Sequence, residues 1–253
     1  MHLSIGHLYP ETMGLYGDRG NIITLMRRCE WRGIDVTVTA LRDGDPVDSA
    51  AHDILFFGGG ADREQSSVGQ DLLTVKADGM RAAVELDVVV LAVCGGYQLL
   101  GKYFRTLEGE EIPGLGILDA WTIAGTHRAI GNVVVEALTG LPGQTLVGFE
   151  NHSGQTFLGD GCKPLARVVQ GNGNNGKDRT EGAVYRNVYG SYLHGSLLPK
   201  NPWFADHLIL QALQRRFGVD VSLTPLDDAL EQRAHASVIA RVKKLGKLRT
   251  GVR

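Results

Sequence analysis

The chain has 253 residues, of which 43% are hydrophobic, and its formal net charge at pH 7 is -2. This length and apolar content suit one substantial core, and they favour a single α/β domain over two catalytic domains. The near-neutral charge gives no electrostatic footprint for nucleic acid, and we find neither an apolar stretch long enough to span a membrane nor an N-terminal signal. The three cysteines, Cys29, Cys94 and Cys162, are widely spaced, which disfavours a disulfide framework or a CxxC metal site and indicates a cytoplasmic protein.

Apolar segments alternate with amphipathic ones along the first half of the chain. Strands are predicted at 2–8, 34–39, 53–57 and 88–93, and helices at 21–32 and 70–85. This alternation is typical of an open, mostly parallel sheet with helices on both faces. Ile22, Leu25 and Cys29 fall on one face of the first helix, so Cys29 is assigned to the core.

The second half is predicted to contain shorter strands, some of them antiparallel, at 132–136, 145–148, 165–169 and 182–192. Residues 171–178 have the glycine and lysine spacing of a phosphate loop, but Asp178 stands where a Mg²⁺-binding Ser or Thr is needed. We interpret this Asn- and Gly-rich segment as the tip of a hairpin.

Two helices are expected near the end of the chain. Asn201-Pro202 begins one that Gly218 ends, and Thr224 is expected to begin another. The basic residues at the end of that second helix either complement its dipole in solvent or contact a partner. They are Arg241, Lys243, Lys244, Lys247, Arg249 and Arg253.

The stretch 87–101, DVVVLAVCGGYQLLG, runs from a buried strand through Cys94 and two glycines into a helix. A reactive side chain at such a turn forms a nucleophile elbow, and the N-terminus of the helix favours a thiolate. A free cysteine at the end of an apolar strand is more often a small buried hydrophobic residue. Whether Cys94 is a nucleophile or a core residue therefore depends on which residues stand at the ends of the other strands.

Two further strand ends favour chemistry at Cys94. Three glycines at 58–60 follow one strand, and His194 closes another. We predict that the backbone N–H groups of Gly59, Gly60 and Gly95 hold an oxyanion, and that His194 takes a proton from Cys94 and returns it to a leaving amine. A thiol, an imidazole and bare N–H donors together meet the requirements of acyl transfer.

This set, with CGGYQLLG at 94–101, resembles the class I (triad-type) glutamine amidotransferases, and within them the cobyric acid synthase branch. Three further segments are similar to one subfamily, the glutaminase subunits of lipid II isoglutaminyl synthase. They are the opening run 7–21, THR at 126–128 and GFENH at 148–152. The resemblance covers about residues 1–210 in order.

The resemblance implies that the chain hydrolyses L-glutamine through a Cys94 thioester and passes ammonia to a Mur-ligase-like partner, MurT, in a heterodimer. The partner would bind ATP and Mg²⁺ and amidate the D-glutamate of the lipid-linked peptidoglycan stem peptide, with no cofactor or metal in this chain. Residues 1–200 would form the glutamine amidotransferase domain of this class I fold, and residues 201–253 would add C-terminal helices packed on it or extending it.

Two substrate contacts are also implied by the resemblance. Arg128 would pair with the α-carboxylate of glutamine, and Gln98, in the first turn after the elbow, would touch the substrate. The alternatives without a function are that Arg128 is an exposed surface arginine and that Gln98 lies on a helix surface.

The sequence departs from the class at one place. A glutamate usually stands two residues after the active-site histidine, whereas Gly195 and Ser196 follow His194. We hypothesise that a carboxylate of the partner, or less favourably Glu150 or Asp62 of this chain, orients the imidazole.

Other polar residues receive less specific interpretations. Tyr16 and Asp18, in the glycine-rich entry loop, are expected to border the substrate or meet the partner. His7, His127 and His152 lack the spacing of a zinc site, so no metal site is assigned. His152 is expected to support a loop by hydrogen bonding.

Three other functions stay open at this point. A glutaminase for corrinoid amidation has the same CGGYQ elbow but usually adjoins an ATP-binding domain in one chain. A silent binding module would need Cys94 and His194 to lie too far apart or blocked. A cysteine peptidase of similar fold would leave Arg128 and the entry loop without a role.

Overall fold

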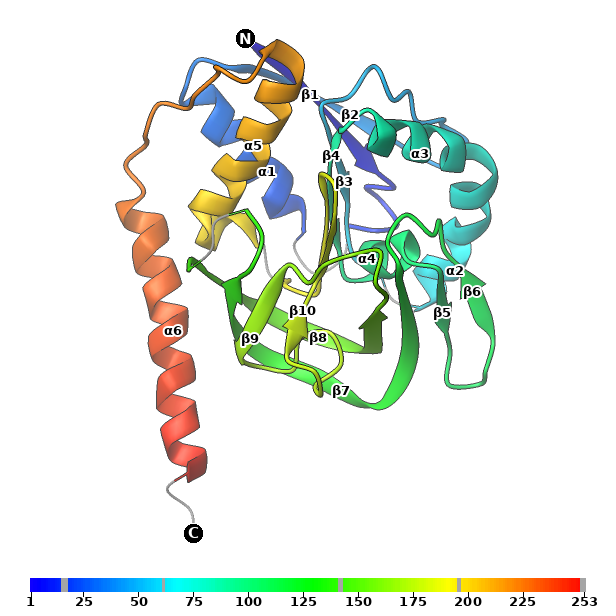
Figure 1. Ribbon diagram of the computed structural model, residues 1–253, viewed down its shortest axis with the longest axis vertical. Helices are drawn as coiled ribbons and strands as arrows, with labels where there is room; N and C mark the ends of the chain where they lie inside the picture. Colours follow the sequence, from blue (N-terminus) through cyan, green and yellow to red (C-terminus); the bar gives the residue numbers. More distant parts are fainter. Residues whose placement is uncertain (15–17, 61, 141–142, 195–196, 251–253) are drawn as a thin grey trace.

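A computed structural model describes residues 1–14, 18–60, 62–140, 143–194 and 197–250, except for the side chains of residues 62 and 245–250. Two six-stranded sheets make up the body, and helices cover the first of them on both faces (Figure 1). The second sheet lies below the first in this view, and the long helix α6 stands at the side. The two sheets meet where the first sheet presents the ends of its strands.

The first sheet has the order β11-β12-β4-β3-β1-β2, and only the β11–β12 pair is antiparallel. The expectation of an open, mostly parallel sheet is therefore confirmed. Its strands are β1 (His2–Leu8), β2 (Asp35–Leu41), β3 (Ile54–Phe57), β4 (Val89–Val93), β11 (Ala183–Tyr185) and β12 (Val188–Ser191). The central strands β3, β4 and β12 are buried along their whole length, as the apolar runs predicted.

Helices α1 (Arg19–Glu30) and α5 (Pro202–Phe217) pack together on one side of this sheet, and α2 (Asp62–Asp71) and α3 (Ala77–Glu85) lie on the other (Figure 1). A π-helical turn, Leu72–Lys76, joins α2 to α3, so the predicted helix at 70–85 begins earlier than expected. The short helix α4 (Gly95–Leu100) follows β4. Cys29 is 1% exposed, which confirms that it belongs to the core.

The second sheet has the order β10-β9-β7-β5-β6, with β8 paired to β7. Its strands are β5 (Tyr103–Arg105), β6 (Glu111–Pro113), β7 (Ala120–Ala137), β8 (Thr145–Leu158), β9 (Ala166–Gln170) and β10 (Thr180–Glu181). β7 and β8 are far longer than the predicted strands, because their polar middle parts pair with each other across an irregularity between Ala124 and Ala129. Residues 171–178 join the antiparallel β9 and β10, which confirms the hairpin.

The C-terminal helix α6 (Ala229–Thr250) begins after the predicted start at Thr224. It is anchored on the second sheet, where Val238, Ile239 and Val242 pack against Val134 and Val147. Among the described helices none is long and apolar enough to cross a membrane. The side chains of Lys247 and Arg249, and all of Arg253, lie outside the described part of the chain.

A buried arginine, Arg28, joins α1 to α5 and to the segment before α6. Arg28 on α1 is 1% exposed, and its guanidinium donates to Asp206 on α5 at 2.6 and 2.7 Å. It also donates to Asp228, just before α6, at 2.6 and 3.1 Å. Charge-assisted bonds of this kind fix the relative positions of the elements that carry them.

We expect Arg28→Met to lower the free energy of unfolding by about 3 kcal/mol, because it leaves the partly buried Asp228 without its cation and leaves Asp206 paired with Arg32 alone. The matched control is Arg27→Met on the same helix, whose exposed pair with Glu30 contributes less than about 1 kcal/mol. Urea denaturation of both variants measures the difference. Equal losses in the two variants would contradict the structural role of Arg28.

Candidate active site

Three neighbouring parallel strands of the first sheet end side by side at the candidate site. β12 leads to His194, β4 leads to Cys94, and β3 leads to the glycines at 58–60. The registers Phe57↔Ala92 and Ser191↔Val93 hold the three ends level. The predicted thiol, imidazole and glycine loop are therefore brought together at the carboxyl edge of the sheet, where open α/β sheets place their ligands.

Cys94 occupies a strained turn between β4 and α4. Its φ of 48° and ψ of -106° are rarely adopted by residues other than glycine, and this costs about 1–3 kcal/mol. Two hydrogen bonds hold the turn in place, from the Cys94 N–H to the Ser191 carbonyl and from the Gln98 N–H to the Cys94 carbonyl. The side chain is thereby held at the helix N-terminus in the geometry of a nucleophile elbow.

His194 lies beside Cys94 and is fixed between the two sheets. Its backbone exchanges hydrogen bonds with Phe149 of β8, at 2.8 and 3.2 Å. Its side chain is in hydrogen-bonding contact with Cys94. A silent module would need this pair to be separated or blocked, whereas among the described residues the two side chains are in contact.

The carboxylate of Asp18 completes the arrangement on the other side of the imidazole. Asp18 precedes α1 and is fully buried, and its Oδ1 lies 3.5 Å from Nδ1 of His194. Burial disfavours the protonated imidazole, but the interactions with Cys94 and Asp18 outweigh it and raise the pKa of His194 above its ordinary value. A protonated imidazole in this place is the counter-ion that a thiolate nucleophile requires.

Asp18 is a candidate for the orienting acid that the sequence interpretation did not consider for this role. Glu150 instead accepts hydrogen bonds from Asn172 and Gly173, and the side chain of Asp62 lies outside the described part of the chain, as does Tyr16. The hypothesis that a partner supplies the acid stays a prediction, but this chain already places a carboxylate beside His194. Only the position of Asp18 in the entry loop, with no local pattern, could have suggested it.

The glycine loop lies against the elbow because glycines stand at the points of contact. A Cβ on Gly59 would come 2.9 Å from Cε1 of His194, 3.1 Å from Oδ2 of Asp18 and 3.3 Å from Cβ of Cys94. A Cβ on Gly96 would lie 2.7 Å from the carbonyl oxygens of both Phe57 and Gly58. Larger residues at these two positions would force the loop and the elbow apart.

The N–H groups of the three glycines predicted as oxyanion donors differ in their surroundings. The Gly59 N–H donates to Oδ2 of Asp18 at 2.9 Å, so it is engaged by the acid. Within the described part of the chain, no hydrogen bond occupies the N–H of Gly60 or of Gly95. The Gly60 and Gly95 N–H groups are therefore available to an oxyanion, whereas the Gly59 N–H already donates to Asp18; the oxyanion role of these glycines stays a prediction.

The side chain of Gln98 is buried, and both ends of its amide are hydrogen-bonded within the chain. It is 5% exposed, its Oε1 accepts from Gln65 at 2.8 Å, and its Nε2 donates to the hydroxyl of Tyr192 at 2.9 Å. Gln65 also donates to the carbonyl of Gly60 at 3.4 Å. These bonds tie the elbow helix to the glycine loop and to the strand of His194, and they account for the side chain without a substrate.

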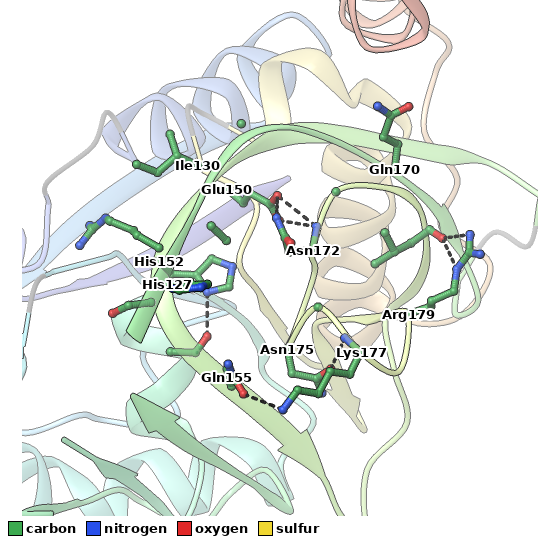
Figure 2. Close-up of a pocket in the computed structure, with 18 of the residues that line it drawn as sticks. His127, Ile130, Glu150, His152, Gln155, Gln170, Asn172, Asn175, Lys177 and Arg179 are labelled. Atoms are coloured by element: carbon green, nitrogen blue, oxygen red, sulfur yellow. Dashed lines mark hydrogen bonds between the residues drawn. The ribbon is translucent and has the colours of Figure 1, made fainter. Parts of the chain in front are cut away.

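Arg128 lies on β7 at the irregular part of the β7–β8 pair. Its Nε donates to Oδ1 of Asn151 at 2.7 Å, and its exposed guanidinium borders a groove of about 1280 Å³. We call this the β8 groove, and Figure 2 shows its residues. Its lining includes Arg128, Glu150, His152, Gln155, Asn172 and Lys177.

A cysteine, histidine and aspartate at the carboxyl edge of a parallel sheet define a thiol enzyme of the acyl-transfer class. Residues 4–202 match the CobB/CobQ-like glutamine amidotransferase domain, and the chain belongs to this family. It is therefore a glutamine amidotransferase.

Two relatives are similar over nearly the whole chain. The lipid II isoglutaminyl synthase (glutamine-hydrolyzing) subunit GatD of Streptococcus pneumoniae is 43% identical, over 91% of this chain and 88% of its own length. The subunit of the same name from Staphylococcus aureus is 40% identical, over 98% of this chain and 100% of its own. A glutamine amidotransferase structure from Thermotoga maritima covers 94% of both chains with a TM-score of 0.56 at 15% identity, which supports the class I fold.

A buried glutamate supports the strand that carries His194. Glu181 is fully buried and accepts hydrogen bonds from the Ser191 hydroxyl at 2.7 Å and the Tyr192 N–H at 2.9 Å. Burial raises its pKa to about 7, against the opposing effect of these hydrogen bonds.

We expect the free energy of unfolding to fall by on the order of 3 kcal/mol as the pH rises from about 4.5 through 7, because the folded chain holds this proton longer than the unfolded chain. Glu181→Gln should flatten this dependence, while the surface control Glu108→Gln should leave it unchanged. Chemical denaturation between pH 4.5 and 8 measures both slopes. An unchanged slope in Glu181→Gln would show that another group is responsible.

Proposed function

We propose that this chain is the glutamine-hydrolysing subunit of a lipid II isoglutaminyl synthase. The observation that carries the proposal is the contact of Cys94, His194 and Asp18 at adjoining strand ends. The similarity of the chain to two subunits of that name, over nearly its whole length, supports the choice of this synthase.

The reaction begins when the Cys94 thiolate attacks the carboxamide carbon of L-glutamine, its proton having passed to His194. The tetrahedral intermediate places its oxyanion at the N–H groups of Gly60 and Gly95, which no hydrogen bond occupies among the described residues. The C–N bond then breaks as the nitrogen takes the proton from His194 and leaves as ammonia. Water, deprotonated by the same imidazole, hydrolyses the glutamyl thioester to glutamate.

Asp18 acts as the positioning acid of this mechanism. Its Oδ1 faces Nδ1 of His194, which fixes the ring so that Nε2 serves Cys94, and its negative charge stabilises the imidazolium. The same carboxylate binds the Gly59 N–H and so fixes the glycine loop relative to the imidazole.

Arg128 is the residue we propose for the α-carboxylate of glutamine. Its guanidinium is exposed at the wall of the β8 groove; Nε donates to the Asn151 side chain at 2.7 Å and Nη2 makes a long bond of 3.5 Å to the Asn151 carbonyl. A planar guanidinium can bind a carboxylate through two parallel hydrogen bonds. Gln98 supports the site from behind by holding the elbow, Gln65 and Tyr192 in place.

The ammonia is used by a partner subunit. We propose a Mur-ligase-like partner of the MurT kind, which binds ATP and Mg²⁺ and amidates the D-glutamate of the lipid-linked stem peptide on the cytoplasmic side. The support for a partner is that both relatives are named as subunits of a synthase.

Cys94→Ala should abolish glutamine hydrolysis without lowering the thermal midpoint, because the thiol is the nucleophile and alanine fits its space. The wild-type chain should gain one covalent adduct at Cys94 from 6-diazo-5-oxo-norleucine, and glutamine should compete with it. Intact-mass and peptide mass spectrometry measure the adduct, and Cys162→Ala is the control that should still react. Hydrolysis that survives Cys94→Ala would refute the nucleophile.

Asp18→Asn should lower kcat by roughly a hundredfold or more with little change in KM, because the imidazole loses its orienting acid but substrate contacts stay. Glu30→Gln, an exposed acid on α1, is the control. Ammonia release should be measured with the chain alone and with its partner present. Full activity of Asp18→Asn in the complex would instead support an acid supplied by the partner.

A further inference from the structure

His152 is held in one tautomer by its position on β8. Its Nδ1 lies 2.8 Å from the Gly154 carbonyl oxygen, which can only accept a hydrogen bond, so Nδ1 carries the proton. Burial lowers the pKa of His152 to about 4, which keeps the ring neutral at physiological pH. The other nitrogen, Nε2, therefore presents a lone pair and can act only as an acceptor.

The ring cannot turn to satisfy that lone pair elsewhere. It is stacked on Tyr192, with ring centroids 3.7 Å apart and an interplanar angle of 9°. The Tyr192 hydroxyl is fixed in turn by Gln98 at 2.9 Å and by Thr156 at 2.6 Å. The imidazole is thus clamped between its own hydrogen bond and an aromatic ring that is itself held in place.

Nε2 of His152 has no hydrogen-bond partner among the described residues, although the side chain is only 4% exposed. A buried acceptor left unsatisfied costs about 1–3 kcal/mol. The unsatisfied acceptor belongs to a residue that lines the β8 groove, as Figure 2 shows. A donor brought by a bound molecule would remove this cost.

The charges around His152 indicate what kind of donor fits. His194 and Arg128 are both close enough to lower its pKa through their positive charges, while Glu150, two residues earlier on β8, is engaged by Asn172 and Gly173. Two neighbouring cations disfavour an added ammonium and favour a neutral N–H group. His152 also stacks on Tyr192, which stands two positions before His194. In the proposed reaction His194 donates the proton to the leaving nitrogen.

Resting on the proposed function, we infer that Nε2 of His152 accepts a hydrogen bond from the carboxamide N–H of glutamine and so positions the leaving nitrogen beside His194. Accepting one N–H turns the nitrogen lone pair, as it forms, toward the proton on the imidazolium. His152 itself gains no proton: the C–N bond breaks, His194 supplies the proton, and ammonia leaves next to the β8 groove.

The test compares substrates that differ in the leaving group. L-Glutamine has the N–H that His152 would accept, whereas L-glutamate γ-methyl ester has none. His152→Asn retains a donor for the Gly154 carbonyl but has no atom at the place of Nε2, and His152→Gln can set its amide oxygen there. His2→Asn, at the partly exposed start of β1 and far from the site, is the matched control.

We expect His152→Asn to lower kcat/KM for L-glutamine by roughly a hundredfold and for the ester by no more than about threefold. The constant kcat/KM reports the steps up to formation of the thioester, in which the leaving group departs. His152→Gln should recover part of the loss, and His2→Asn should change kcat/KM for neither substrate. Circular dichroism and the thermal midpoint check the fold of each variant.

Equal losses on amide and ester in a folded His152→Asn would overturn the inference and leave His152 a structural residue. Glutaramate, which lacks the α-amino group, provides a further comparison. If the loss disappears with glutaramate, the α-amino group and not the carboxamide is the donor, and the inference is wrong. A wild-type chain that hydrolyses no glutamine, alone or with its partner, overturns the proposed function itself and this inference with it.

Discussion

The close approach of the glycine loop to the elbow is the constraint on which the site depends. Gly59 lies among the side chains of Cys94, His194 and Asp18, at distances that leave no room for a Cβ. Because β3, β4 and β12 are neighbours in a parallel sheet, their ends meet, and only glycine lets the loop after β3 reach the other two. The strain at Cys94 is tolerated because buried strands and short hydrogen bonds fix the turn from both sides.

The parts of the fold that could be predicted carry strong local signals. The apolar runs of β1, β3 and β4 and the helix α5, with Asn201 at its start and Gly218 at its end, agree with the structure within a residue or two. Cys94 and His194 could be brought together from the sequence, since each stands where an apolar strand ends beside glycine, and parallel strands end at one edge. Local pattern and tertiary structure agree in these elements.

The parts that could not be predicted depend on contacts distant in sequence. Asp18 is separated from His194 by most of the chain, and it precedes a helix in a loop whose residues have no periodic pattern. The middle of β7, with Gly125, Thr126 and Arg128, is polar and partly exposed and falls in the irregularity, so β7 continues through it because the residues on both sides pair with β8, and not because of propensity. Gln98 appeared free to meet the substrate because nothing in the sequence places Gln65 and Tyr192 at the two ends of its amide.

An acid from the loop after β1 couples two functions that an acid directly after the histidine would keep separate. One oxygen of Asp18 faces His194 and the other binds the Gly59 N–H, so a shift of this carboxylate moves the imidazole and the glycine loop together. Asp18 lies immediately before α1, and α1 is joined through Arg28 to α5 and to the segment before α6. The orientation of the imidazole therefore depends on helices that never touch the thiol. A displacement of α1 would therefore act on the imidazole and on the glycine loop together, through the two oxygens of Asp18.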